Sequence, residues 1–185
     1  MASCPDIQIE RWTPDSSHPA ADVAGLADLL KACVDAGASV SFIQPFSLTD
    51  AGAFWNCKIL RAVQTGRCRA LLARNPGRQI VGTVQLDLAT PPNQSHRGEV
   101  RKLLVHPAAR RRGIARALML AIEQEAREAN RTLLTLDTVT GGFAESLYLS
   151  LGYTKSGIIP GFARRPDSLE LEATTILYKQ LVPLP

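Results

Sequence analysis

A run of arginines and one glycine stands where a predicted strand ends and a predicted helix begins. It reads Val105-His-Pro-Ala-Ala-Arg110-Arg-Arg-Gly-Ile-Ala115, and a further arginine follows at position 116. A helix N-terminus has unpaired backbone N–H groups and a partial positive charge, so it suits a phosphate. Gly113 would let an anion approach the backbone, and the arginines would add donors. The stretch predicts pyrophosphate binding, but taken alone it is equally typical of a helix start beside solvated arginines.

Other phosphate-binding designs are missing from the sequence. No G-x-x-x-x-G-K-[ST] motif occurs, and no two glycines stand two positions apart, so no G-x-G-x-x-G motif occurs either. These absences argue against nucleotide hydrolysis and dinucleotide redox chemistry.

The elements that would position this loop follow from apolar spacing and turn residues. Helices between strands in the second half predict a partly parallel sheet, and a hairpin around Asn75-Pro-Gly77 makes the sheet mixed. The length of 185 residues suits one α/β domain over 1–185. In chain order we expect a strand at 7–12, helices at 20–36 and 50–65, strands at 69–73, 79–89 and 99–105, a helix at 112–129, a strand at 133–139, a helix at 142–151, and strands at 153–159 and 170–182.

Two motifs resemble those of a known family. Arg110-x-x-Gly113-x-Ala115 after a strand resembles the [QR]-x-x-G-x-[GA] pyrophosphate loop of the GCN5-related N-acetyltransferases (GNAT). Ala144-Glu-Ser-Leu-Tyr148, followed by Gly152-Tyr153, is similar to the later A-x-x-L-Y and G-[FY] motif of that family. Segments 37–42, 96–105 and 133–141 are also similar to tabtoxin-resistance acetyltransferases, which acetylate an amino-acid β-lactam toxin. Gly141-Gly142 stands where many acetyltransferases have an Asn, which puts one cofactor hydrogen bond in doubt.

The resemblance implies a fold, a cofactor and a set of binding positions. The fold would be a single GNAT-like domain with a central mixed, mostly antiparallel sheet, about four flanking helices and a splay between the fourth and fifth strands. The cofactor would be acetyl-CoA, with coenzyme A as product, and strand backbone near a bulge would pair with the pantetheine arm. The implied cofactor-binding residues are Leu103, Leu104, Val105, Arg110, Arg111, Arg112, Gly113, Ile114, Ala115, Arg116, Thr138, Ala144 and Leu147.

The same resemblance implies direct acetyl transfer to an amine, with Tyr148, Glu99 and Asp137 as catalytic candidates. Tyr148 matches the tyrosine that protonates the departing CoA sulfur; the alternative is a packing tyrosine. Glu99 would act as a base, and the alternative is an ion pair with Arg97 or Arg101. Because Glu99 is early and Asp137 late in neighbouring parallel strands, whether both reach one amine stays open.

Composition narrows the alternatives. The net charge of +4 and pI near 9.1 suit a polyanionic ligand, but with 5% aromatic residues they favour no nucleic acid partner. The cysteines and histidines show no metal-ligand spacing, so we expect no metal and reduced thiols. No signal peptide is visible, and the longest uncharged stretch, 36–49, is too short for a membrane span; we expect a cytoplasmic protein with no membrane partner.

The leading functional hypothesis is an acetyl-CoA-dependent N-acetyltransferase acting on a small-molecule amine, with an amino-acid β-lactam toxin as one candidate. The alternatives are acetylation of a protein N-terminus or lysine, and a CoA-binding module without catalysis. Phe42, Phe46 and Trp55 could line an acceptor pocket or serve as ordinary packing residues. A homodimer through the late strands is an open expectation.

Overall fold

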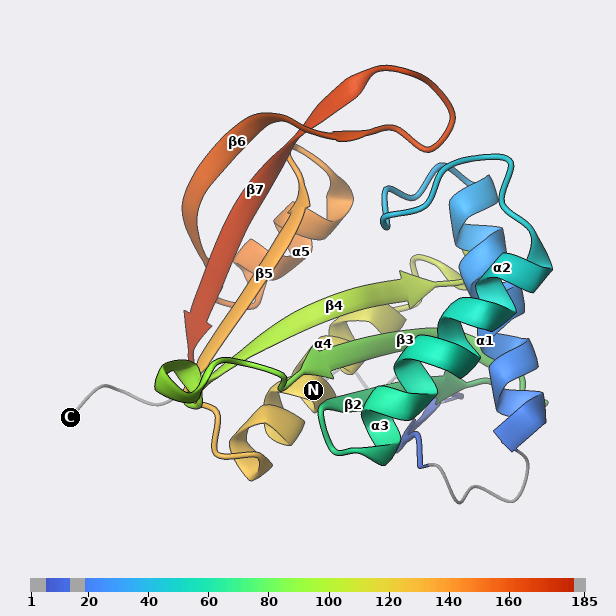
Figure 1. Cartoon of the computed structure of the whole chain (residues 1–185), viewed down its shortest axis with the longest axis horizontal. Coiled ribbons are helices and arrows are strands. Elements are labelled where there is room, and N and C mark those ends of the chain that lie inside the picture. Colours follow the sequence, from blue (N-terminus) through green and yellow to red (C-terminus); the bar gives the residue numbers. More distant parts are fainter. Residues whose placement is uncertain (1–5, 14–18, 182–185) are drawn as a thin grey trace.

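The computed structural model of the chain describes residues 6–13 and 19–181 (Figure 1). Its sheet has seven strands in the order β1-β2-β3-β4-β5-β7-β6, and the β4–β5 pair is parallel while the others are antiparallel. The mixed, mostly antiparallel α/β fold expected from the sequence is therefore confirmed. The strands are β1 (Gln8–Arg11), β2 (Cys68–Arg74), β3 (Ile80–Asp87), β4 (Arg97–Val105), β5 (Leu133–Val139), β6 (Thr154–Arg164) and β7 (Leu171–Gln180).

Helices cover both faces of the sheet (Figure 1). On one face lie α1 (Pro19–Asp35), α2 (Leu48–Ala53) and α3 (Arg61–Gln64), and on the other lie α4 (Ile114–Glu128) and α5 (Phe143–Ser150). Two 3-10 turns, η2 (Pro92–Gln94) and η3 (Pro107–Ala109), flank β4. The single helix expected at 50–65 is divided, because the π-helical segment η1 (Phe54–Leu60) separates α2 from α3.

Each face of the sheet packs its own apolar core. The side chains of Leu118, Met119 and Ile122 pack α4 onto one face, and Leu26, Leu30 and Trp55 pack α1 and η1 onto the other. All six are at most 1% exposed. The 3.6-residue spacing of the apolar positions in α1 and α4 produces these buried stripes. The helices therefore hold β2, β3 and β4 from both sides.

A bulge in β4 reverses the face of the sheet toward which the following side chains point. Thr83 of β3 is opposite Leu104 and Gln85 is opposite Arg101, so two β4 residues, Lys102 and Leu103, face one β3 position. Lys102 takes a left-handed φ of 50° there. As a result Val100 packs in the α4 core while Leu104 packs in the α1 core. This is why the apolar alternation of the strand is not regular in sequence.

The pairing of β4 with β5 ends after three residues. Arg97, Gly98 and Glu99 pair with Leu133, Leu134 and Thr135, and no later pair is formed. A Cβ on Gly98, in the paired part of β4, would lie 2.7 Å from Leu86 Cδ1 of β3, so Leu86 packs closely over this glycine. Beyond Glu99 and Thr135 the two strands diverge (Figure 1). The expected splay between the fourth and fifth strands is confirmed.

Several element bounds differ from the prediction. β4 begins two residues earlier than expected, and β6 runs to Arg164 as an exposed edge strand. Residue 182, the expected end of the last strand, lies outside the described residues, as does Cys4, one of the four cysteines expected to be reduced thiols. Within 6–13 and 19–181, no helix is long and apolar enough to cross a membrane, and no group of three potential metal ligands occurs.

Candidate functional site

The divergence of β4 from β5 leaves two strand edges facing one another without a ladder. On β4 this edge runs through Leu103 and Val105, and on β5 through Asp137 and Thr138. Free N–H and C=O groups along such edges bind an extended ligand as an added strand would. We call the region between these two edges the opening; its free edges suit a long, amide-containing molecule.

The loop between β4 and α4 stands at one end of this opening. Arg110 is extended, whereas Arg111 has φ 65° and Gly113, the residue before α4, has φ 79°. No side chain caps the first turn of α4, and a Cβ on Gly113 would meet nothing within 4 Å. The N-terminal amides of α4 therefore face open space in which an anion fits.

The arginines of this loop point in different directions. The Arg110 Nε donates to the Val105 carbonyl at 3.3 Å. The Arg111 guanidinium lies 5.1 Å from the Phe143 ring centroid, and Arg116 Nη2 donates to Ser150 Oγ at 2.6 Å. The contacts of these three arginines join the end of β4, α4 and α5 around the start of α4, where an anion would bind.

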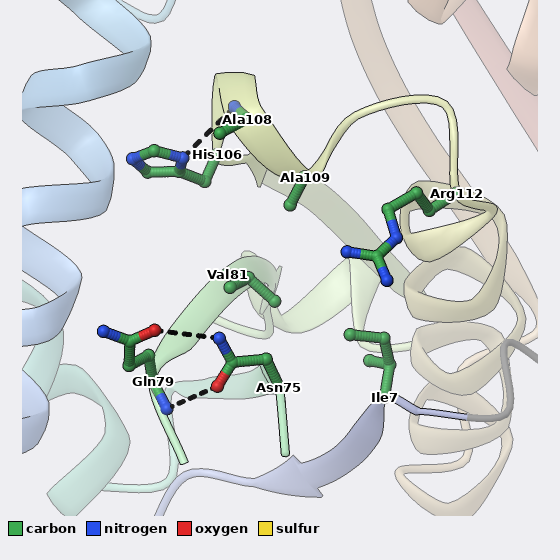
Figure 2. A pocket seen from close by; sticks show the side chains of 8 residues that line it. All are labelled: Ile7, Asn75, Gln79, Val81, His106, Ala108, Ala109 and Arg112. Carbon is green, nitrogen blue, oxygen red and sulfur yellow. Dashed lines mark hydrogen bonds between the residues drawn. The ribbon is translucent and has the colours of Figure 1, made fainter. Parts of the chain in front are cut away.

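Arg112 is directed elsewhere. Its side chain lines a cavity of about 240 Å³ together with Ile7, Asn75, Gln79 and Val81 (Figure 2). Of the four arginines predicted to bind the cofactor, Arg112 is thus the one whose guanidinium lies beside β1 and the β2–β3 turn.

The other positions predicted to bind the cofactor lie along the opening or beneath it. Leu103, Val105, Ala144 and Leu147 are partly buried against the α4 core. Thr138 and Ala115 are also partly buried, whereas Leu104 and Ile114 are 2% and 1% exposed, so their side chains belong to the core. For Leu104 and Ile114 only the backbone is available to a ligand.

Tyr148 lies on the inner face of α5 and is 6% exposed. Its ring packs at 5.8 Å from that of Tyr153, centroid to centroid. Burial, and secondarily the charge of Asp137, raises the pKa of Tyr148 above its ordinary value. The phenol therefore stays protonated at neutral pH and can donate a proton.

The two candidate carboxylates are in different situations. Glu99 lies 2.9 Å from Arg101 Nε, and Arg97 Nη1 is 3.9 Å away, so the ion-pair alternative for Glu99 holds in the structure. Asp137 is exposed, and its Oδ2 accepts a hydrogen bond from Thr174 Oγ1 at 3.0 Å. Asp137 acts electrostatically on Tyr148, while Glu99 is opposite Thr135, two residues earlier on β5. Of the two carboxylates, it is therefore Asp137 whose charge acts on the tyrosine.

Lys102 is a residue of this site that sequence reasoning missed. It lies on the β4 bulge, and its ammonium donates to Ser41 Oγ at 3.0 Å. Burial, with the like charges of Arg101 and Lys58, lowers the pKa of Lys102 to about 8. The irregular alternation of β4 was the available signal, but it does not say which residue bulges. Thr174, the partner of Asp137, carries no sequence signal.

The segment between α1 and α2 forms a rim on one side of the opening. Gln44 Nε2 donates to the Val34 carbonyl at 2.8 Å, and the Gln44 N–H donates to the Pro166 carbonyl of the β6–β7 loop at 2.8 Å. Of the aromatic residues considered for an acceptor pocket, Phe46 and Trp55 are core residues, at 8% and 0% exposure, and Phe42 is partly buried. Phe42 is therefore the one available to a ligand.

These groups together can perform a defined kind of chemistry. The uncapped start of α4 suits a polyanion, the free strand edges suit an amide-containing chain, and Tyr148 and Asp137 offer a proton donor and acceptor where that chain would end. Such an arrangement suits group transfer from a long phosphorylated carrier.

Comparison with known proteins agrees with this geometry. A family model described as the acetyltransferase (GNAT) family matches residues 38–153, more than half of the chain. N-acetyltransferase 8B of Rattus norvegicus is 30% identical over 131 residues, which cover 64% of this chain and 59% of that protein. The chain thus spans less than two thirds of the length of this relative.

Solved structures share the whole fold. A structure of yncA from Salmonella typhimurium with its cofactor acetyl-CoA has a TM-score of 0.75 at 18% identity and covers 96% of this chain and 95% of that one. Ribosomal-protein-alanine N-acetyltransferase from Brucella melitensis has a TM-score of 0.75 at 22% identity, over 94% and 99% of the two chains. At these identities the likeness is one of fold.

Proposed function

Because the chain belongs to the acetyltransferase (GNAT) family, we propose that it transfers an acetyl group from acetyl-CoA to the primary amine of a small molecule. The observation that carries the proposal is the opening between β4 and β5, which leads from the uncapped start of α4 to Tyr148 and Asp137. Acetyl-CoA as the donor agrees with the family and with the related fold that carries it.

The residues of the opening fit acetyl-CoA. The amides that follow Gly113 would hold the pyrophosphate, and Arg110, Arg111 and Arg116, which surround the start of α4, would add positive charge there. The backbone from Leu103 to Val105 would pair with the amides of the pantetheine arm. Thr138, Ala144 and Leu147 would line the opposite wall, on β5 and α5.

Acetyl-CoA, when bound, supplies the acetyl group as a thioester, which an amine can attack directly. Asp137, fixed by Thr174, would accept the proton that the acceptor ammonium must lose. Tyr148 would hold a proton for the departing sulfur, since its raised pKa keeps the phenol protonated. A backbone N–H of the β4 bulge would stabilise the developing oxyanion, at about 3 kcal/mol for a well-placed donor.

A small acceptor is supported by the rim of the site. The hydrogen bond from Gln44 to Pro166 joins the α1–α2 segment to the β6–β7 loop, which narrows access from that side. A protein N-terminus or lysine would need an open groove there. An amino-acid β-lactam is one member of the small-molecule class proposed.

We also infer a homodimer through β6. This strand is the end of the sheet, is exposed along almost its whole length, and presents Ile158, Ile159 and Phe162 to solvent at 44–52% exposure. An edge strand with exposed apolar side chains is typical of an interface. Light scattering at two protein concentrations tests it, and a monomer at both concentrations contradicts it.

The experiment that tests the proposed function is thiol release from acetyl-CoA by the purified chain against a panel of small amines, together with CoA binding. Turnover with one or more amines supports the proposal. CoA binding without turnover would favour the non-catalytic module, and turnover only with peptides would favour a protein acceptor. Absence of CoA binding overturns the proposal altogether.

A further inference from the structure

Five residues from three elements form a cation–aromatic cluster beside the opening: Ser41, Phe42, Phe54, Lys58 and Lys102. The Lys102 Nζ lies 5.6 Å from the Phe42 ring centroid and 6.0 Å from that of Phe54, and it donates to Ser41 Oγ. The Lys58 Nζ lies 5.9 Å from the Phe54 centroid. Two ammonium groups therefore share one aromatic surface.

The backbone around the cluster is held in conformations that side-chain-bearing residues rarely adopt. Ser41 has φ 75° and Lys102 has φ 50°, and their side chains are hydrogen-bonded to each other. Phe54 and Lys58 come from the π-helical segment η1. Left-handed non-glycine residues and π-helical turns are frequent at functional sites, where the surrounding structure maintains backbone conformations that the local sequence disfavours. Their meeting at one point indicates more than loop anchoring.

Across residues 6–13 and 19–181, the ammonium groups of Lys58 and Lys102 form no direct ion pair with a carboxylate. Within the part of the chain that the structure describes, no carboxylate lies within 4 Å of the ammonium of Lys58 or Lys102. Arg101 acts on Lys102 as a like charge but is itself paired with Glu99 and Asp87, and the carboxylate that acts on Lys102 is Asp137. Positive charge thus gathers on the α1–α2 side of the opening, while the candidate proton acceptor lies on β5.

We propose that the cation–aromatic cluster binds the carboxylate of the acceptor, so that the enzyme selects small molecules carrying both an amine and a carboxylate. The inference rests on the proposed function and names the acceptor class of that site. A carboxylate at Lys102 and Lys58 makes charge-assisted hydrogen bonds, and the amine of the same molecule is directed toward Asp137. Phe42 and Phe54, which pack edge to face, offer apolar surface to the carbon skeleton that joins the amine and the carboxylate of the acceptor.

A purely structural role predicts something different. If Lys102 only fastens the α1–α2 segment to β4, its loss lowers turnover of every acceptor by a similar factor. Recognition of a carboxylate instead changes the ratio between acceptors that differ only in that group. The ratio is therefore the readout.

The test compares leucine, phenylalanine, glutamine and β-alanine with their carboxamides, by thiol release from acetyl-CoA. Each carboxamide has the less basic amine, so simple reactivity favours it, whereas we expect kcat/KM at least tenfold higher for the amino acid. Lys102→Met should reduce this preference at least tenfold, and Lys102→Arg should retain most of it. Lys31→Met, which removes a lysine paired with Asp35 on α1, is the matched control and should keep the wild-type ratio.

Each outcome decides the matter. Preference for the carboxamides in the wild type, or an unchanged preference in Lys102→Met, overturns the inference. If Lys102→Met fails to fold, Lys58→Met supplies the same ratio. If none of these amines is acetylated, calorimetry of leucine binding to the CoA-loaded protein decides: binding that Lys102→Met abolishes supports the inference, and no binding overturns it. Failure to bind CoA, by contrast, overturns the proposed function itself.

Discussion

Replacement of Gly113 by alanine separates the anion-binding role of this residue from its role in folding. Gly113 has φ 79°, and a Cβ there would meet nothing within 4 Å, so the folded chain can accommodate the methyl group sterically. The left-handed backbone costs an alanine about 1–2 kcal/mol, and loss of chain entropy in the unfolded state offsets about 0.4–1 kcal/mol of this. The net loss of stability should be about 1 kcal/mol, or about 2–4 °C in Tm.

Gly113→Ala should lower the affinity for CoA by more free energy than it lowers the stability of the fold. The methyl group would stand in the open space above the first amides of α4, where the pyrophosphate is proposed to bind. Loss of one hydrogen bond to a charged group corresponds to about 1.5–3 kcal/mol. The dissociation constant for CoA should therefore rise about 10- to 100-fold.

The chain contains a matched control for this substitution. Gly66, in the turn before β2, has φ 69° and open space around the same Cβ position. Gly66→Ala should lose a similar amount of stability in urea denaturation and bind CoA with wild-type affinity in calorimetry. If Gly113→Ala binds CoA as tightly as Gly66→Ala does, the assignment of the anion site is refuted.

Three further outcomes follow from particular contacts. Asp137→Asn should lower kcat about 100-fold, and Glu99→Gln less than tenfold, because the charge of Asp137 acts on Tyr148 whereas Glu99 is paired with arginine; the reverse order in steady-state kinetics would exchange their roles. The contribution of Lys102 to the unfolding free energy should rise between about pH 8 and the ordinary lysine pKa, because the folded chain releases the Lys102 proton before the unfolded chain does; urea titrations measure it as the difference between the wild type and Lys102→Met, which should grow over that range. Asp22→Asn should lower the unfolding free energy by about 2–4 kcal/mol in urea titrations, because it removes the buried negative charge 2.6 Å from Arg74 Nη2. A decrease below about 1 kcal/mol would contradict this prediction.

Local patterns predicted the parts of the molecule that depend on neighbouring residues. The order of strands and helices follows apolar spacing and turn residues, and the loop before α4 is a short motif whose glycine adopts the left-handed conformation that the motif needs. The splay between β4 and β5 followed from family resemblance. The structure places the last pair of the two strands at Glu99 and Thr135.

The features that depend on long-range register were not predictable in the same way. At the bulge, two β4 residues, Lys102 and Leu103, lie opposite one β3 residue. This shift in register directs Lys102 to the α1–α2 segment. The direction of Arg112 depends on its packing beside β1 and the β2–β3 turn. The ion pair of Glu99 with Arg101 was one of two alternatives for Glu99; both residues lie on β4, and only the side-chain geometry shows that the ion pair forms.

The most direct test of the central claim compares the wild type with Tyr148→Phe in acetyl-CoA binding and in thiol release with an accepted amine. Phenylalanine keeps the ring that packs on Tyr153 and removes only the hydroxyl. If the opening between β4 and β5 holds acetyl-CoA with its sulfur at Tyr148, the variant should bind acetyl-CoA within about threefold of the wild type while kcat falls about 100-fold or more. Unchanged turnover in Tyr148→Phe would contradict the account.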